Sequence, residues 1–265
     1  MSADNPAGDN APMAPDVRRL HVYALRLGDD ALILAQRLSE WASRAPEIEE
    51  DIALTNMALD LLGQARALLA YAGTVEGADR DEDDLAYLRS EREFWNVHLV
   101  EQENGDFAHT IARQLFFSTY QLALYEELIS SGDEMLAGVA AKGVKEAAYH
   151  RDHAEHWVAR LGDGTDESHR RMQAAVDRLW PFTAELFDAD DVEKTLAAQG
   201  VAVDPSSLAA GWRHAVGEVL RSATLTIPET VWNSHGGRRG VHTEAFGYLL
   251  AEMQYLHRTH PGATW

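Results

Sequence analysis

One stretch of the chain, EAAYHRDHAEH, holds the densest group of side chains that could bind a metal ion or transfer a proton. In a helix, Glu146, His150 and His153 lie on one face, so a carboxylate and two imidazoles would project together. Neutral imidazoles with a carboxylate suit iron or zinc. His156 continues the same face by another turn. The stretch is therefore a candidate metal site.

The motif is nevertheless imperfect by the standard of di-iron carboxylate proteins. Those proteins take a Glu from each of two helices and a Glu-x-x-His from each of two others. Here Glu146 is followed at the histidine position by Tyr149, with His150 one residue later, and an upstream segment reads Asp60-Leu-Leu-Gly63. A shortened carboxylate and a missing imidazole cannot complete the set. We interpret these five residues as degenerate ligand positions, with hydrogen-bonded or surface histidines favoured over a metal site.

A polar stripe runs through the segment that contains Asp60. Asn56, Asp60 and Gln64 recur at every fourth position of an otherwise apolar segment. Such a stripe is either the solvated edge of an amphipathic helix or a buried hydrogen-bond network. The sequence leaves both interpretations open.

A basic, glycine-rich loop, HGGRRG, lies near the end of the chain. Its backbone amides could hold an anion, but in a strongly acidic chain Arg238 and Arg239 also suit docking to an acidic partner surface. Trp265, the last residue, would gain from burial in a core or in a partner. We therefore mark Arg238, Arg239 and Trp265 as partner or anion contacts. The chain has no Gly-x-Ser-x-Gly, Walker or Gly-x-Gly-x-x-Gly motif.

The elements that position these residues are predicted to be helices, because Leu and Ala recur at helical spacing without alternating β-branched runs. Residues 1–16 are rich in Pro, Ala, Asn, Asp and Gly and are predicted to form a disordered tail. Residues 17–265 are predicted to form a single domain, an antiparallel helical bundle with additional C-terminal helices. The predicted helices cover 28–41, 47–72, 85–100, 107–129, 133–160 and 168–180, followed by shorter ones at 184–187, 190–199, 206–223 and 243–259.

Composition excludes several classes of function. The 265 residues include 23 Lys and Arg against 43 Asp and Glu, a net charge of 23 − 43 = −20. That charge repels nucleic acids and anionic membranes. Without cysteine, the chain cannot form disulfides, thiolate zinc sites or iron–sulfur clusters. No apolar run approaches the roughly 18 residues of a membrane span, and the first residues do not resemble a signal peptide. We expect a cytoplasmic protein.

From about Leu20 to Trp265 the chain resembles the C subunits of bacterial ring 1,2-phenylacetyl-CoA epoxidases. The resemblance is carried by many ordered segments: LRLGD at 25–29, LDLLGQAR at 59–66, VEQ at 100–102 with NG at 104–105, TIARQ at 110–114, RLG at 160–162 with GTD at 164–166, FTAELF at 182–187, GGRRG at 236–240, HTE at 242–244, LAEMQYL at 250–256 and PG at 261–262.

The resemblance implies a ferritin-like fold and a role within a multicomponent mono-oxygenase. In such complexes the A subunit holds the di-iron centre and the substrate, phenylacetyl-CoA, whose ring is epoxidised with dioxygen. A reductase subunit with FAD and an iron–sulfur cluster delivers electrons from NADPH, and the complex also has a small B-type subunit. The C subunit pairs with A as a structural, non-catalytic partner, which implies no cofactor in this chain. The alternative is a metal-bearing oxidoreductase acting on its own through Glu146, His150 and His153.

Overall fold

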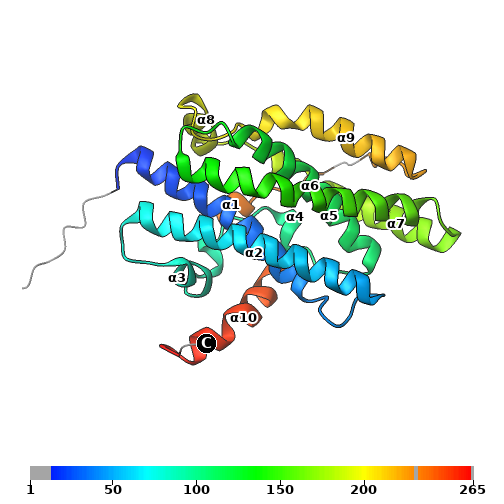
Figure 1. Ribbon diagram of the computed structural model, residues 1–265, viewed down its shortest axis with the longest axis horizontal. Coiled ribbons are helices and arrows are strands. Elements are labelled where there is room, and N and C mark those ends of the chain that lie inside the picture. Colours follow the sequence, from blue (N-terminus) through cyan, green and yellow to red (C-terminus); the bar gives the residue numbers. More distant parts are fainter. Residues whose placement is uncertain (1–12, 230–231, 264–265) are drawn as a thin grey trace, which may run out of the picture.

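The computed structural model describes residues 13–229 and 232–263 and is built from helices (Figure 1). Within these residues it contains ten α-helices, five short 3-10 helices and no β-strand. The α-helices are α1 (Pro15–Ser39), α2 (Ile48–Glu76), α3 (Glu82–Tyr87), α4 (His98–Glu101), α5 (Phe107–Leu128), α6 (Glu134–Gly162), α7 (Asp166–Leu179), α8 (Asp191–Ala198), α9 (Ala209–Ser222) and α10 (Glu244–Thr259). The 3-10 helices cover Glu91–Glu93, Trp180–Phe182, Ala184–Phe187, Pro205–Leu208 and Gly237–Arg239. The predicted all-α fold is confirmed.

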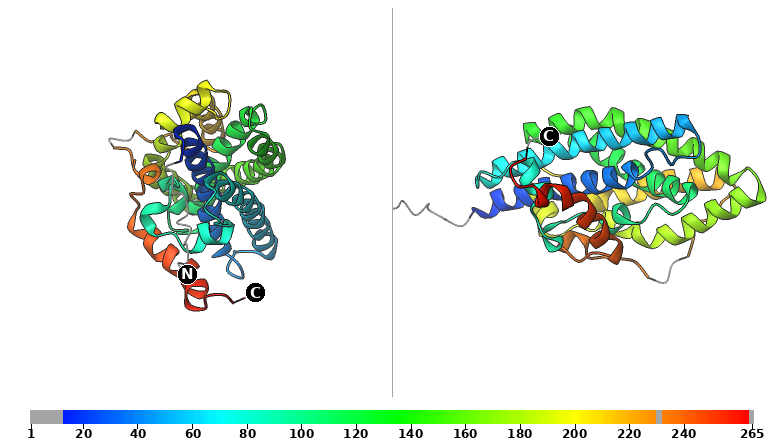
Figure 2. Two further views of the ribbon diagram at one scale, coloured as in Figure 1. Left: turned by 90° about the vertical axis from the view of Figure 1, so that its left-hand side faces the viewer. Right: turned by 90° about the horizontal axis from the view of Figure 1, so that it is seen from below.

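Four long helices, α1, α2, α5 and α6, form the bundle (Figures 1 and 2). Each consecutive pair, α1 with α2 and α5 with α6, packs along its length, as short antiparallel connections require. Their buried faces consist mainly of Leu, Ala, Phe and Tyr and form one continuous hydrophobic core. The arrangement is a ferritin-like helical bundle. Helices α7 and α9 pack on the α5–α6 pair, and α10 projects from the body (Figure 1).

Side-chain caps define the helices that carry the site. The Asp106 carboxylate accepts the backbone N–H of His109 at the start of α5, and Asp133 accepts two backbone N–H groups at the start of α6. Such caps satisfy amides that have no partner within the helix. Gly77, with a φ of 70°, ends α2 in the left-handed conformation.

The predicted start of the first helix near Gly28 was wrong, because α1 begins at Pro15. A proline fits the first turn of a helix, where its missing N–H has no partner to lose. Gly28 instead allows α1 to approach α2 closely. A Cβ added at Gly28 would lie 2.9 Å from a methyl group of Leu69.

The single helix predicted over 85–100 was also wrong, since this segment is divided between α3, a 3-10 turn and α4. Two buried carboxylates on α1 hold the intervening chain extended. Asp29 accepts the backbone N–H of Trp95 at 2.9 Å, and Asp30 accepts that of Val97 at 2.8 Å. In a helix, these two N–H groups would instead donate to backbone carbonyls of the same helix.

Within the described residues, none of the helices combines the length and the hydropathy that crossing a membrane would require.

Candidate functional site

Amide, phenol and carboxylate side chains meet between α2, α5 and α6, in the middle of the bundle. The buried Gln64 donates from Nε2 to Oε2 of Glu146 at 2.8 Å. Its Oε1 accepts from Gln121 Nε2 at 2.9 Å and from the Tyr125 hydroxyl at 3.0 Å. Three helices are thereby joined through one glutamine. The buried network is the correct interpretation for Gln64, while Asn56, at the other end of the predicted stripe, is exposed.

Tyr125 can occupy its place in this network because the residue that faces it on α6 has no side chain. A Cβ added at Gly143 would lie 2.4 Å from the Tyr125 ring, so only glycine permits this approach. Burial raises the pKa of the Tyr125 hydroxyl far above its ordinary value. The phenol therefore remains protonated and acts as a donor to Gln64.

The histidines of α6 bind carboxylates of α2 rather than one another. His150 Nε2 lies 3.1 Å from Asp60 Oδ2, and His153 Nε2 lies 2.8 Å from Glu50 Oε2. Burial lowers the pKa of His150, and the hydrogen bond to Asp60 partly opposes that shift. His156 is exposed and bonds a carbonyl of its own helix. The predicted histidine-rich stretch thus joins two helices along their length.

The residues in the middle of the bundle do not fit a di-iron centre. Such a centre needs about four carboxylates and two imidazoles that converge. Gly63 and Tyr149, at two of the degenerate positions, are exposed at the surface. Buried polar atoms without a partner include the side-chain oxygens of Gln114 and Gln121, which are neutral amides, and Nδ1 of His153, whose other ring nitrogen contacts Glu50. Across the residues described, no three His, Asp or Glu side chains are grouped so that they could hold a metal ion.

A second buried polar region involves the glycine-rich loop. Arg238 donates to the carbonyl oxygens of Trp95 at 2.9 Å and of Arg26 at 3.1 Å, and it pairs with Asp30 at 2.7 Å. Arg238 is thus engaged by its own chain. The neighbouring Arg239 is exposed, so the partner or anion contact predicted for the two arginines is left to Arg239. Trp265 lies outside the described residues.

The backbone of the same loop is bound by a buried acid. Glu185 accepts the N–H groups of Gly236 and Gly237, each at 2.7 Å, and that of His98, also at 2.7 Å. The loop passes so close to Asn96 that position 237 must be glycine, because an added Cβ would lie 2.1 Å from the carbonyl oxygen of Asn96. The amides that the sequence suggested for an anionic ligand hold a carboxylate of the protein itself.

The sequence prediction missed most of this charged region. Its members are dispersed along the chain and almost all are buried: Arg26, Asp29, Asp30, Arg89, Glu101, Glu185, Glu193, Arg238 and His242. The segments at 25–29, 236–240 and 242–244 do include several of them. Their burial has no local signal, because the partners are brought together by the fold and not by helical spacing.

Comparison with known proteins places the chain in a family. A sequence profile described as phenylacetic acid catabolic protein matches residues 6–265. The chain belongs to this family. One curated member, the C subunit of 1,2-phenylacetyl-CoA epoxidase from Escherichia coli (strain K12), is 51% identical over 249 residues, which cover 94% of this chain and 100% of that protein. The resemblance found in the sequence is confirmed.

The chain forms a ferritin-like bundle, and the related protein from Escherichia coli is itself named as one of the subunits of an epoxidase. In the present chain, Gln64, Gln121 and Tyr125 occupy the middle of that bundle as a hydrogen-bonded network.

Proposed function

We propose that this chain is a structural, non-catalytic subunit of a multicomponent di-iron mono-oxygenase that epoxidises the ring of phenylacetyl-CoA during aerobic phenylacetate degradation. Its role is to stabilise the catalytic A subunit, which holds the iron and the substrate. The complex also includes a small B-type subunit and a reductase with FAD and an iron–sulfur cluster. The extensive identity to the C subunit of an epoxidase supports the assignment to such a complex.

The non-catalytic role is supported chiefly by the kind of polar side chains found in the middle of the bundle. The side-chain amide of Gln64 both donates and accepts hydrogen bonds, and Glu146 accepts the one from its nitrogen at 2.8 Å. Two neutral glutamines, a phenol and the single carboxylate of Glu146 supply neither the charge nor the number of ligands that two iron ions require. The hydrogen bonds among these groups connect three helices and fix their packing.

A stabilising partner has a physical rationale in an enzyme of this type. A catalytic bundle that buries ionised carboxylates loses stability through desolvation. A second bundle that covers a large apolar surface of the first can offset this loss. Permanent interfaces of this kind bury more than about 2,000 Å².

The alternative, an oxidoreductase that acts alone through Glu146, His150 and His153, gains no support from the geometry. Nε2 of each histidine faces a different carboxylate of α2, and Glu146 faces Gln64. The three groups therefore have separate partners and do not converge on one point.

Co-expression tests the proposal. The A subunit is produced with and without this chain, and its soluble yield and its epoxidation of phenylacetyl-CoA with the reductase and B-type subunit are measured. We expect both to fall strongly without this chain. An A subunit that is soluble and equally active by itself would overturn the stabilising role.

A further inference from the structure

The outer face of α2 carries a line of aliphatic side chains that nothing in the described chain covers. Ile48, Ile52, Leu59 and Leu62 are exposed by 72%, 57%, 59% and 40%. With Thr55 between them, they recur at alternating spacings of four and three residues, the pattern of helices that pack lengthwise on another helix. At the helical rise, the line extends for about 21 Å.

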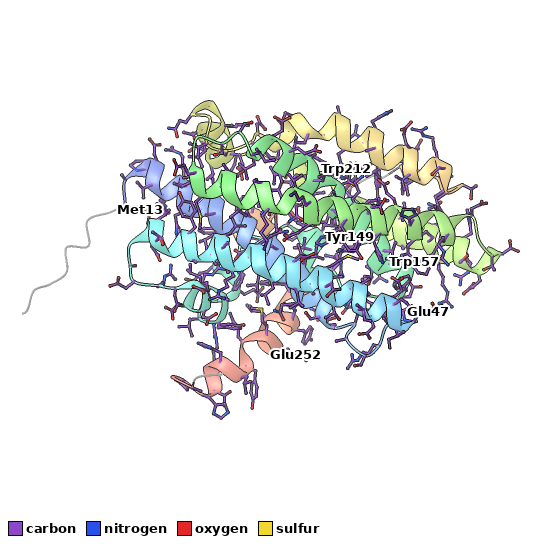
Figure 3. All side chains as sticks on the ribbon, viewed as in Figure 1. Met13, Glu47, Tyr149, Trp157, Trp212 and Glu252 are labelled. Atoms are coloured by element: carbon purple, nitrogen blue, oxygen red, sulfur yellow. The ribbon has the colours of Figure 1, made fainter. Side chains whose placement is uncertain are left out.

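Helix α6 lies beside α2 and widens this surface (Figure 2). Tyr149 of α6, labelled in Figure 3, is 49% exposed. The contacts of His150 with Asp60 and of His153 with Glu50 hold α6 against α2. We call the surface formed by Ile48, Ile52, Leu59, Leu62 and Tyr149 the α2–α6 face. Its rigid support makes it suitable for docking a preformed partner.

The charges around the α2–α6 face are opposite at its two ends. Glu47, labelled in Figure 3, is exposed where α2 begins, and Glu49 is exposed as well. At the far end, Lys142 lies beside Gly63, with its Nζ 3.8 Å from the position of an added Cβ, and Lys145 is exposed nearby. An occupant must therefore match an apolar centre, an acidic end and a basic end.

We propose that the α2–α6 face is the surface on which the catalytic A subunit docks, through one helix of that subunit lying antiparallel to α2. An antiparallel helix would place its C-terminal end against Glu47 and Glu49. Basic side chains are favoured at helix C-termini and would complement these acids, while acidic residues at its N-terminal end would face Lys142. The inference rests on the proposed function and adds the surface by which the subunit acts.

A second copy of the chain is the less suitable occupant. Each copy has a net charge of −20, and the repulsion between two such chains opposes their association. A less acidic partner with the same arrangement of apolar positions avoids that repulsion. Self-association through this face is therefore an outcome that would contradict the proposal.

A paired set of variants tests the surface. Ile52→Glu with Leu59→Glu places charges in the apolar centre, and Tyr248→Glu with Tyr255→Glu serves as the matched control. The two tyrosines are exposed by 71% and 68% on α10, away from the face. Each variant is co-expressed with a tagged A subunit, the amount of complex recovered on the tag is measured, and helix content is checked by circular dichroism. We expect recovery of the α2 variant to fall on the order of 100-fold and that of the control to stay unchanged.

Lysine modification tests the unaltered protein and does not depend on variants that fold. The chain has three lysines, Lys142, Lys145 and Lys194, and all three are exposed in the isolated subunit. Acetylation of the complex should be suppressed several-fold at Lys142 and retained at Lys194, which lies on α8. Equal labelling of Lys142 in the free and bound chain would overturn the proposal.

The outcomes separate this inference from the proposed function. If the unaltered chain fails to bind or stabilise the A subunit, the proposed function fails. If it binds and the α2 variant binds equally well, the docking surface is wrong while the proposed function stands. Loss of binding in the control alone would place the interface on α10 and also overturn the proposal.

Discussion

Gln64 and Glu146 are joined across α2 and α6 by a 2.8 Å hydrogen bond in which the amide nitrogen donates to the carboxylate. Since Gln64 also accepts from two groups of α5, this one bond completes a connection among three helices. The chain is similar to a subunit of an epoxidase, and in the middle of its bundle this network connects three helices.

Removing the acceptor should therefore reduce stability. In Glu146→Ala the buried N–H of Gln64 loses its partner, and we expect the free energy of unfolding to fall by about 1–3 kcal/mol. Urea denaturation measures this. Lys142→Ala is the control, because Lys142 is exposed and its 3.3 Å contact with Glu146 contributes less than about 1 kcal/mol. Equal losses in the two variants would show that the surface charge, and not the buried network, matters at Glu146.

Two glycines of α6 should respond in opposite directions to the same substitution. Gly143→Ala forces a Cβ against the Tyr125 ring, so we expect a loss of about 1–3 kcal/mol through overpacking. Gly138→Ala meets open space and should stabilise the helix by up to about 1 kcal/mol. Thermal unfolding of both variants checks the prediction. A stabilised Gly143→Ala variant would mean that Tyr125 can leave its place at no cost.

The two adjacent arginines of the glycine-rich loop should differ strongly. Arg238→Ala leaves the buried Asp30 without its cation, and we expect a loss of about 3–5 kcal/mol. Arg239 is exposed, so Arg239→Ala should change the stability of the isolated subunit by about 0.5 kcal/mol or less. Chemical denaturation of both variants separates the two roles, and similar values would contradict the buried assignment of Arg238.

The buried pair of His242 and Glu101 predicts a pH dependence of stability. Burial works against protonation of His242, but the hydrogen bond at 2.8 Å and the charge of Glu101 raise its pKa above the ordinary value. A raised pKa means that the folded protein holds the proton more tightly than the unfolded chain does. The stabilisation is complete below about pH 6.5 and is lost as the pH rises through the folded pKa.

Urea denaturation between pH 5.5 and about 9 measures that dependence, with His242→Gln as the reference. The difference in stability between the two proteins should shrink as the pH rises. Asp30, whose pKa burial raises to about 6, titrates in both proteins and cancels in the difference. A difference in the free energy of unfolding that grows with pH would contradict the assignment of His242 as a protonated partner of Glu101.

The helices of the bundle could be predicted from sequence because their apolar positions repeat locally. The Asn56–Gln64 stripe was recognised for the same reason, although only the structure shows that Gln64 is buried and Asn56 is not. Recognition of the family also came from local segments, such as the one that includes Gln64.

The charged region could not be predicted in this way. Arg26 pairs with Asp190 and Glu193, more than 160 positions later in the chain. Arg238 reaches Asp30 from 208 positions away. Local periodicity treats such charges as signs of a surface or a loop. Burial of a charge depends on its partner, and the partner is known only once the fold is known.

The iron content of this chain decides whether it can be catalytic. The chain is expressed alone in iron-supplemented medium, purified, confirmed as helical by circular dichroism, and its iron is determined by elemental analysis. Because the middle of the bundle presents amides, a phenol and the carboxylate of Glu146, whereas a di-iron centre needs about four carboxylates and two imidazoles, we expect iron near zero per folded chain. About two irons per folded chain would contradict the non-catalytic role and would make the stretch from Glu146 to His156 a metal centre.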